Sequence, residues 1–367
     1  MEDARYNAVI VGQTGVGKSS LINYLYGTNV AKTGVGKPVT QNGFHPINFE
    51  LNGLPVCLFD SWGLEVGSYT QWMNDLEQEF KQRGVDEPAD KWFHSVFYCI
   101  QAGGARIQDC DIEIINKFIS EKYKVSVILT KCDQVSEEVE EALKKELQNR
   151  IVGLSIISVC SEKIKTRMGI SEPFGKEIVE KQAFNDFFDS LILRLPLRCK
   201  KVSTDRLKEW GIKSKNNVKD DVGFAGFSQS ETEGTIKKSA QNELLEIERM
   251  VNYEVKSTFK MYGTFADKLG YPPVNKSSTN QKNDSLFYQY KKYTDIEWWE
   301  IPLIVVLSPI AIVWGLWSGK DDAIEEVNKY IEKCENKITI EIDKQIIGIQ
   351  KMLTELKNKL IVIEKST

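Results

Sequence analysis

A glycine-rich stretch near the start of the chain, Gly12 to Ser19 (GQTGVGKS), has the residue types that bind phosphate groups. Its glycines allow backbone conformations that aim successive N–H groups at phosphate oxygens, and it lies between an apolar run and a predicted helix. Lys18 can reach the β- and γ-phosphates of a nucleoside triphosphate, and the Ser19 hydroxyl can bind Mg²⁺. The residues expected to contact the nucleotide here are Gly12, Gly15, Val16, Gly17, Lys18, Ser19 and Ser20.

A second motif, Asp60 to Gly63 (DSWG), follows a predicted strand over residues 54–59. A carboxylate at this strand end can hold Mg²⁺ through water, so we expect Asp60 to join Ser19 in a metal site. Gly63 has no Cβ, and its backbone N–H can therefore approach the γ-phosphate. Because that contact exists only in the triphosphate state, the motif predicts a loop that orders and disorders with the nucleotide.

A third motif, Thr130 to Asp133 (TKCD), follows a predicted strand over residues 125–129. The Asp133 carboxylate can accept two hydrogen bonds from the N1 and exocyclic amine of guanine, a donor pair that adenine lacks. Lys131 is expected to lay its aliphatic stem over the base. The backbone of the loop Ser158 to Ser161 is expected to touch the guanine oxygen, with Ser158 and Val159 as the candidate residues. The alternative for Asp133 is a helix-capping role. The predicted ligands are GTP or GDP with Mg²⁺.

The second half of the chain reads differently from the first. Strand-like runs stop after a predicted helix over residues 176–193, which is expected to end at Leu195 and Pro196. Residues 199–233 predict a polar connector, and apolar spacing predicts helices over 239–260 and 324–363, the latter as one long helix or a broken pair. We therefore expect two domains, a nucleotide-binding domain over 1–198 and an α-helical domain over 199–367.

These motifs resemble those of the TRAFAC-class P-loop GTPases, and most of all the bacterial HSR1-related and Era-like GTPases and the immunity-related (interferon-inducible) GTPases. The resemblance covers about the first half of the chain. It is carried by GQTGVGKSSLIN at 12–23, GKPVT at 36–40, DSWGLE at 60–65, residues 93–111 and TKCD at 130–133. It implies an α/β fold with a mostly parallel sheet of six strands, helices on both faces, and GTP hydrolysis.

The resemblance also assigns roles at the γ-phosphate. Thr40 matches the threonine that binds Mg²⁺ and the γ-phosphate, with Thr33 as the alternative, and Lys18, Thr40 and Gly63 are the expected catalytic residues. Leu64 stands where Ras-like GTPases carry a water-positioning glutamine. A leucine cannot orient water, so we expect slow intrinsic hydrolysis and acceleration from a switch loop or a dimer partner. Arg106 either contacts a switch loop or partner, or forms a surface ion pair with Asp109 or Asp111.

Residues 301–317 contain no charged side chain, and tryptophans lie at both edges of this apolar segment. Its length falls short of the ~20 residues that span a bilayer as a helix, and Pro302 and Pro309 interrupt it. Three interpretations stay open: a kinked hairpin buried in the helical domain, a tip that contacts lipid, and a spanning helix.

Two function hypotheses follow from this segment. In the first, the chain is a GTP-dependent switch whose helical domain contacts or assembles on a membrane, as in immunity-related or dynamin-like GTPases. In the second, it is a cytosolic regulatory GTPase that acts on a protein partner. A ribosome-assembly role ranks below both, because no basic RNA-binding module is visible in the second half.

The composition limits the partners and the cellular compartment that we expect. A formal net charge of −4 offers no nucleic-acid footprint, so no nucleic-acid partner is expected. Seven cysteines without a C-x-x-C pair indicate reduced thiols, and residues 1–7 do not form a signal peptide. We therefore expect a cytoplasmic protein, peripheral to a membrane if residues 301–317 contact lipid, and the resemblance makes a homodimer across the nucleotide face an expectation as well.

Overall fold

The computed structural model describes residues 5–27, 43–61, 64, 68–104, 107–166, 169–221, 229–269 and 320–366. Thr33, Thr40, Gly63, Arg106 and the apolar segment 301–317 lie outside these ranges. The chain divides into two compact units, which are described separately. Unit 1 comprises residues Met1–Arg194 and Met261–Gln289, and unit 2 comprises Leu195–Lys260 and Tyr290–Thr367.

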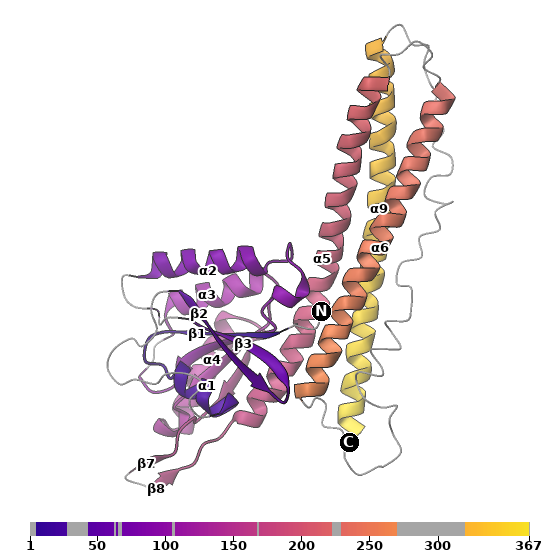
Figure 1. Cartoon of the computed structure of the whole chain (residues 1–367). Helices are drawn as coiled ribbons and strands as arrows, with labels where there is room; N and C mark the ends of the chain where they lie inside the picture. The colour runs from indigo at the N-terminus through magenta and orange to yellow at the C-terminus, as the bar shows by residue number, and fades with distance from the viewer. Residues whose placement is uncertain are drawn as a thin grey trace. The chain divides into compact units, whose positions relative to one another are not determined.

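Unit 1 is built on one six-stranded sheet with the strand order β2-β3-β1-β4-β5-β6 (Figure 1). Only β2 runs antiparallel to its neighbour, so the expected mostly parallel sheet of six strands is confirmed. The strands are β1 Tyr6–Gly12, β2 Phe44–Leu51, β3 Leu54–Ser61, β4 Ser95–Gln101, β5 Val125–Thr130 and β6 Ser155–Ser158, and a separate hairpin pairs β7 Ile164–Thr166 with β8 Gly169–Ser171.

Helices cover both faces of this sheet because successive strand side chains point to opposite faces. Val9 and Val11 belong to a core that includes side chains of α2, α3 and α4. On the opposite face, the Ser126 hydroxyl of β5 donates to Asp186 of α5. The helices of unit 1 are α1 Lys18–Tyr26, α2 Tyr69–Arg83, α3 Asp109–Ser120, α4 Glu137–Arg150 and the start of α5 Lys176–Asp221, with short 3-10 turns at η1 Ala89–Lys91 and η2 Cys132–Gln134.

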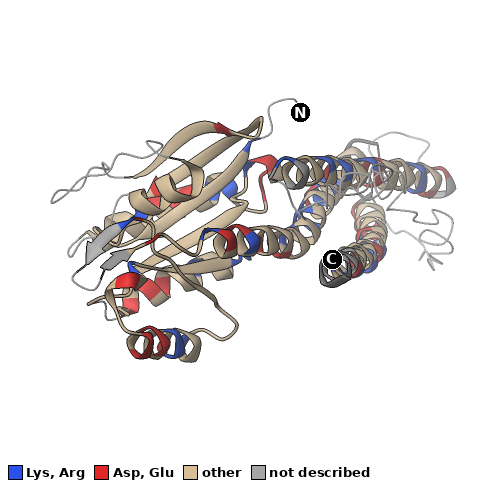
Figure 2. Ribbon diagram, turned by 90° about the horizontal axis from the view of Figure 1, so that it is seen from below, with Lys and Arg blue, Asp and Glu red and all other residues tan. Residues whose placement is uncertain are grey.

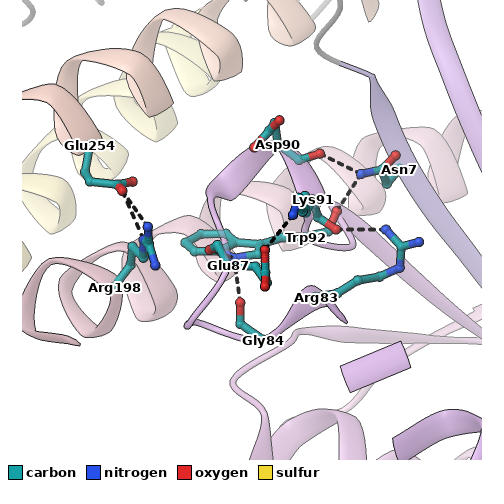
Figure 3. A network of polar contacts seen from close by, with 9 residues as sticks. All are labelled: Asn7, Arg83, Gly84, Glu87, Asp90, Lys91, Trp92, Arg198 and Glu254. Atoms are coloured by element: carbon teal, nitrogen blue, oxygen red, sulfur yellow. Dashed lines mark hydrogen bonds and ion pairs between the residues drawn. The ribbon is translucent and has the colours of Figure 1, made fainter. Parts of the chain in front are cut away.

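The connection between α2 and β4 is held by side chains that bond to backbone carbonyls (Figure 3). The Asn7 amide donates to the carbonyls of Asp90 and Trp92 at 2.8 and 3.0 Å. The Trp92 indole N–H lies 3.0 Å from the Gly84 carbonyl and 2.9 Å from that of Glu87. These bonds fix the start of β4 against β1, and the carboxyl ends of both strands therefore keep their place at the site.

The last turns of helix α6, Gln229–Leu269, return to unit 1 and join an aromatic cluster. Tyr262 stacks on Phe187 with ring centroids 4.0 Å apart, and Phe265 lies 5.0 Å from the ring of His94. His94 is buried, accepts a hydrogen bond from the Asn7 backbone N–H at 2.8 Å, and its Nε2 faces the Ala89 carbonyl at 3.1 Å. His94 is thus a neutral core residue with both ring nitrogens in use.

Burial lowers the pKa of His94 to about 3, and this predicts a loss of stability in mild acid. In the unfolded chain this histidine binds a proton as the pH falls through about 6.5, whereas in the folded chain it stays neutral. The free energy of unfolding therefore falls as the pH drops below 6.5. Each pH unit costs about 1.4 kcal/mol, or roughly 2–3 kcal/mol between pH 6.5 and 4.5. Urea unfolding of the wild type and of His94→Gln at several pH values measures this change in the free energy of unfolding.

The glutamine variant cannot titrate there, so its unfolding free energy should depend on pH by about one proton less than that of the wild type. Measurements at pH 8, above both pKa values, serve as the control for the constant cost of the substitution. Parallel pH profiles of the two proteins would contradict a neutral His94 in the folded state.

Unit 2 contains the rest of α5, most of α6 and helix α9, Lys320–Ser366, which lie side by side (Figure 1). Arg198 of α5 pairs with Glu254 of α6 at 2.7 Å, as Figure 3 shows. Lys200 of α5 pairs with Asp343 of α9 at 2.7 Å. Basic and acidic side chains alternate along the three helices (Figure 2). Mixed charge on the outside and apolar residues between helices explain why these sequences pack together, with α6 and α9 each antiparallel to α5.

Two expectations for this half are corrected. Helix α5 does not end at Pro196, which lies inside it, and the polar connector expected over 199–233 is helical as far as Asp221. Cys199, Leu207, Trp210 and Val218 are buried at helical spacing, and their burial outweighs the polar composition and the bond that Pro196 removes. Helix α9 is continuous, which settles the choice between one helix and a broken pair.

Among the helices within the described ranges, none combines the length and the apolar character that crossing a bilayer requires.

Candidate functional site

The phosphate-binding loop leaves β1 at Gly12 and enters α1 at Lys18, at the carboxyl edge of the sheet. Gly12 has φ +148°, and a Cβ there would lie 2.4 Å from the Cys99 carbonyl oxygen. Gly15 and Gly17 have φ of +79° and +98°, a region that glycine adopts without strain. The loop conformation therefore depends on these glycines, and it leaves the first N–H groups of α1 open to an anion.

Lys18 is placed across this loop. Its side chain is 8% exposed, and its Nζ donates to the carbonyls of Gly12 at 2.9 Å and Gln13 at 3.1 Å. Burial lowers the pKa of Lys18, and the nearby Asp60 carboxylate opposes that shift. The ammonium group is thus held over the loop, next to a carboxylate of opposite charge, where phosphate oxygens can replace the two carbonyls.

The residues predicted to bind Mg²⁺ come from neighbouring elements. Asp60 pairs with Ile10 across β3 and β1, is buried, and lies beside the loop, while Ser19 is half-buried in the first turn of α1. A carboxylate and a hydroxyl are hard oxygen ligands of the kind that Mg²⁺ prefers. No group of three His, Cys, Asp or Glu side chains that could hold a metal occurs in the described part of the chain, so phosphate and water oxygens would complete the shell.

The predicted base-binding motif is tied to the phosphate-binding loop. The Thr130 hydroxyl donates to the Val16 carbonyl, and the Lys131 Nζ donates to the Gly15 carbonyl at 2.9 Å and to Gln101 at 3.1 Å. Lys131 has φ +55°, a left-handed conformation that turns its side chain back toward the loop. The two motifs, 111 residues or more apart in sequence, therefore form one site.

Asp133 carries the clearest sign of an absent ligand. Both of its carboxylate oxygens are buried, and neither accepts a hydrogen bond from the described residues by donor–acceptor geometry. The Cys160 thiol lies nearby, and its pKa is raised by burial and further by Asp133. A buried carboxylate without donors costs on the order of 1–3 kcal/mol or more, which a base with two adjacent N–H groups would recover. The residues present thus fit a guanine base.

The loop after β6 differs from the prediction. The Val159 backbone N–H, expected at the guanine oxygen, instead donates to the Leu129 carbonyl at 2.8 Å, and the Ser158 hydroxyl donates to Glu140. The Val159 N–H continues the pairing with β5, which is why it is not available to a base. Ser161 is the next residue whose backbone N–H bonds no backbone carbonyl in the described ranges. Ser20, also predicted to bind nucleotide, directs its hydroxyl to Glu162 of this loop.

Two residues beside the site were not predicted, Gln13 and Asp111. Asp111 is 2% exposed and accepts hydrogen bonds from Gln13, Tyr98 and the Gln108 backbone. Asp109, the other acidic residue considered for Arg106, pairs with Arg150, and Arg106 itself lies outside the described residues. A lone Gln and Asp at 98 residues' separation give no signal in a sequence pattern.

Leu64 is held against the phosphate-binding loop by its backbone. Its N–H lies 3.5 Å from the Gly12 carbonyl, and its own carbonyl lies 3.4 Å from the Thr14 N–H. The side chain is 8% exposed and belongs to the core shared with α3. Leu64 therefore anchors the loop that follows Gly63 to the core.

This arrangement agrees with comparisons to known proteins. A family model described as 50S ribosome-binding GTPase matches residues 7–152. The GTP-binding protein EngB of Aquifex aeolicus is 32% identical over 161 residues, which are 42% of this chain and 81% of that protein. Cell division control protein 10 of Candida albicans is 22% identical over 171 residues, which are 40% of this chain and 47% of that protein.

The chain thus spans about half the length of the cell division relative. Among solved structures, Era of Aquifex aeolicus is similar with a TM-score of 0.34 and 22% identity, covering 48% of this chain and 55% of that one. The family match over residues 7–152 includes the phosphate-binding loop, Asp60 and the Thr130 to Asp133 motif. The chain belongs to this family of P-loop GTPases.

Proposed function

We propose that the chain binds guanine nucleotide with Mg²⁺, hydrolyses GTP to GDP and phosphate, and acts as a nucleotide-dependent switch. The observation that carries the proposal is the Asp133 carboxylate, buried without donors in a loop that Thr130 and Lys131 tie to the phosphate-binding loop. A base with two adjacent donors satisfies this carboxylate, and adenine has no such pair.

Hydrolysis in this site would be attack of water on the γ-phosphate, in line with the leaving oxygen. Lys18 and the N–H groups at the start of α1 stabilise the charge that develops on the phosphate oxygens. Ser19 and Asp60, with Thr40 as the predicted third residue, would hold the Mg²⁺ ion, which when bound neutralises charge on the β- and γ-phosphates. The chain's own part is to place and polarise the triphosphate.

Leu64→Gln is not expected to speed hydrolysis. The Leu64 side chain points into the core, so a glutamine at this position would bury an amide without partners or leave its place in the core. We expect the unfolding free energy to fall by about 1–3 kcal/mol and the single-turnover rate of GTP hydrolysis to stay within about twofold. Urea unfolding and a quenched single-turnover assay measure the two quantities, with Leu64→Met as the control. A tenfold faster glutamine variant would show that the side chain reaches the nucleotide.

The switch has a physical route to the helices. The β2–β3 hairpin joins residues 28–42, which contain Thr40, to residues 62–67, which contain Gly63. At its turn, the Asn52 amide donates to the Lys268 carbonyl at 3.2 Å, and the Lys268 ammonium donates to the Gly53 carbonyl. Lys268 lies in the last turns of α6. A nucleotide-dependent shift of this hairpin would therefore move the end of α6.

The proposed setting is cytoplasmic and peripheral to a membrane. The apolar segment 301–317, edged by tryptophans, supports a lipid contact of the dynamin-like or immunity-related kind. The alternative is a regulatory GTPase with a protein partner and no lipid contact. Homodimerisation across the nucleotide face belongs to the same proposal, because Leu64 leaves the attacking water without a glutamine in cis.

Nucleotide titrations of the wild-type protein test the proposal. We expect GTP and GDP to bind, ATP to bind at least about 100-fold more weakly, and EDTA to stop hydrolysis. Flotation with liposomes and molar mass in solution, each measured with GDP and with a non-hydrolysable GTP analogue, separate the membrane and dimer proposals from the cytosolic alternative. Equal affinity for ATP and GTP would refute guanine recognition.

A further inference from the structure

The Asp111 carboxylate holds the Gln13 side chain in one place beside the phosphate-binding loop. The Gln13 amide donates to both Asp111 oxygens, at 3.0 and 3.2 Å. The Tyr98 hydroxyl at 2.7 Å and the Gln108 backbone N–H at 2.9 Å donate to the same carboxylate. A buried carboxylate with this many donors keeps a fixed orientation. Gln13 is therefore bonded to a rigid point at the start of α3.

Packing alone does not hold the Gln13 side chain. A pocket of about 180 Å³ opens beside it, between the phosphate-binding loop and the segment that joins β4 to α3. Its lining includes Gln13, Thr14, Gln101, Gly103, Gln108 and Asp111. Because the side chain borders open space, the hydrogen bonds to Asp111 decide its position.

The backbone of Gln13 lies where the loop meets both Lys18 and Leu64. Its carbonyl accepts the Lys18 ammonium at 3.1 Å. The two residues beside Gln13 both bond to the Leu64 backbone. The Gly12 carbonyl accepts the Leu64 N–H, and the Thr14 N–H donates to the Leu64 carbonyl. Leu64 follows Gly63, the residue expected at the γ-phosphate. The position of Gln13 thus bears on the part of the site that responds to the third phosphate.

From this geometry we infer that Gln13 is a positioning residue for GTP hydrolysis, anchored by Asp111. The pair aligns the loop segment on which Leu64 docks and sets the rate of the γ-phosphate step, with little effect on GDP affinity. Within the described part of the chain, the Gln13 side chain bonds to Asp111 and, at 3.3 Å, to the Gln108 amide, and not to the residues expected to bind the base and the first two phosphates, Asp133 and Gly15 to Ser20. The inference rests on the proposed GTPase function.

Gln13→Leu removes the amide and keeps a similar side-chain volume. We expect the single-turnover rate of GTP hydrolysis to fall about 10-fold, because small misplacement of reacting groups is costly, while the Kd for GDP stays within about twofold. Asp111→Asn should lower the rate to a similar degree. The double variant should be no slower than Gln13→Leu alone, since the leucine already removes the amide on which a change at Asp111 would act.

Gln182→Leu is the matched control. Gln182 of α5 also donates its amide to a buried carboxylate, Asp186, at 2.8 Å, on the other face of the sheet. The Gln182→Leu variant should hydrolyse GTP and bind GDP as the wild type does. That result would show that losing such an amide–carboxylate pair elsewhere does not slow the reaction. Thermal melting of each variant confirms that the fold is retained.

Two results would overturn the inference. One is a wild-type hydrolysis rate in Gln13→Leu, and the other is a loss of GDP affinity in proportion to the loss of rate, which would mark a purely structural role. A wild-type protein that neither binds nor hydrolyses GTP would refute the proposed function itself, and the two failures are therefore distinguishable.

Discussion

Asp133→Asn should weaken GTP binding by on the order of 100-fold or more and reverse the preference between GTP and xanthosine triphosphate. Both Asp133 oxygens are buried acceptors. An asparagine keeps one acceptor and turns an N–H₂ group toward the amine of guanine, where two donors repel. Xanthine carries a carbonyl at that position and accepts a hydrogen bond from the new amide. Competition titrations with GTP, XTP and GDP measure the change.

Asp109→Asn is the control for this experiment. Asp109 is exposed and pairs with Arg150, so the same chemical change there should leave both nucleotide affinities as in the wild type. If Asp133→Asn bound GTP as tightly as the wild type and gained nothing for XTP, the carboxylate would not be the group that reads the base.

Arg194→Ala should destabilise the protein by about 3–5 kcal/mol. The Arg194 side chain is fully buried between two aromatic rings, with its guanidinium carbon 4.8 Å from the Trp92 ring centroid and 3.8 Å from that of Tyr123. It donates to the Arg83 carbonyl at 2.7 Å and to the Glu121 carbonyl. Burial lowers the pKa of Arg194. Alanine would leave a cavity, and it would remove one donor from the Glu121 carbonyl and one from the Arg83 carbonyl, which keeps the Tyr123 hydroxyl at 2.7 Å.

Arg194→Met separates these two losses. Methionine fills most of the space but donates nothing, so we expect a cost of about 1–3 kcal/mol, the part due to the carbonyls. Arg249→Ala, at an exposed residue that pairs with Glu246, should change the unfolding free energy by less than about 0.5 kcal/mol. Urea unfolding compares the three variants. Equal costs for alanine and methionine would assign the whole effect to hydrogen bonding.

The site is predictable where its chemistry depends on a few adjacent residues. The phosphate-binding loop needs three glycines and a lysine within seven residues, and Asp133 needs only the end of a strand before it. The backbone contact to the base is harder to assign, because backbone contacts carry no residue signature. Within the predicted loop, the N–H groups of Val159 and Cys160 already bond to the carbonyls of Leu129 and Phe174.

In the helical half, local sequence signals predict the structure less well than they do at the site. Pro196 and the polar stretch after Cys199 are local signals of a helix end, and both gave the wrong boundary. Burial of Leu207 and Trp210 against neighbouring helices outweighs those signals, and the partners of that burial lie in α6 and α9. A helix stabilised by distant segments cannot be delimited from its own composition.

By itself, the sequence determined the fold family and the order of the motifs that follow the strands. It also identified the residues expected to bind phosphate, metal and base, because these features depend on residue type and short spacing. Only the tertiary structure decided which contacts hold each of these residues in place. The pairing of Gln13 with Asp111 and the contact of Lys268 with the β2–β3 turn join residues 98 and 216 positions apart, and the burial of Leu64 is set by core packing. Contacts over such distances arise from the packing of whole elements, and no local pattern records them.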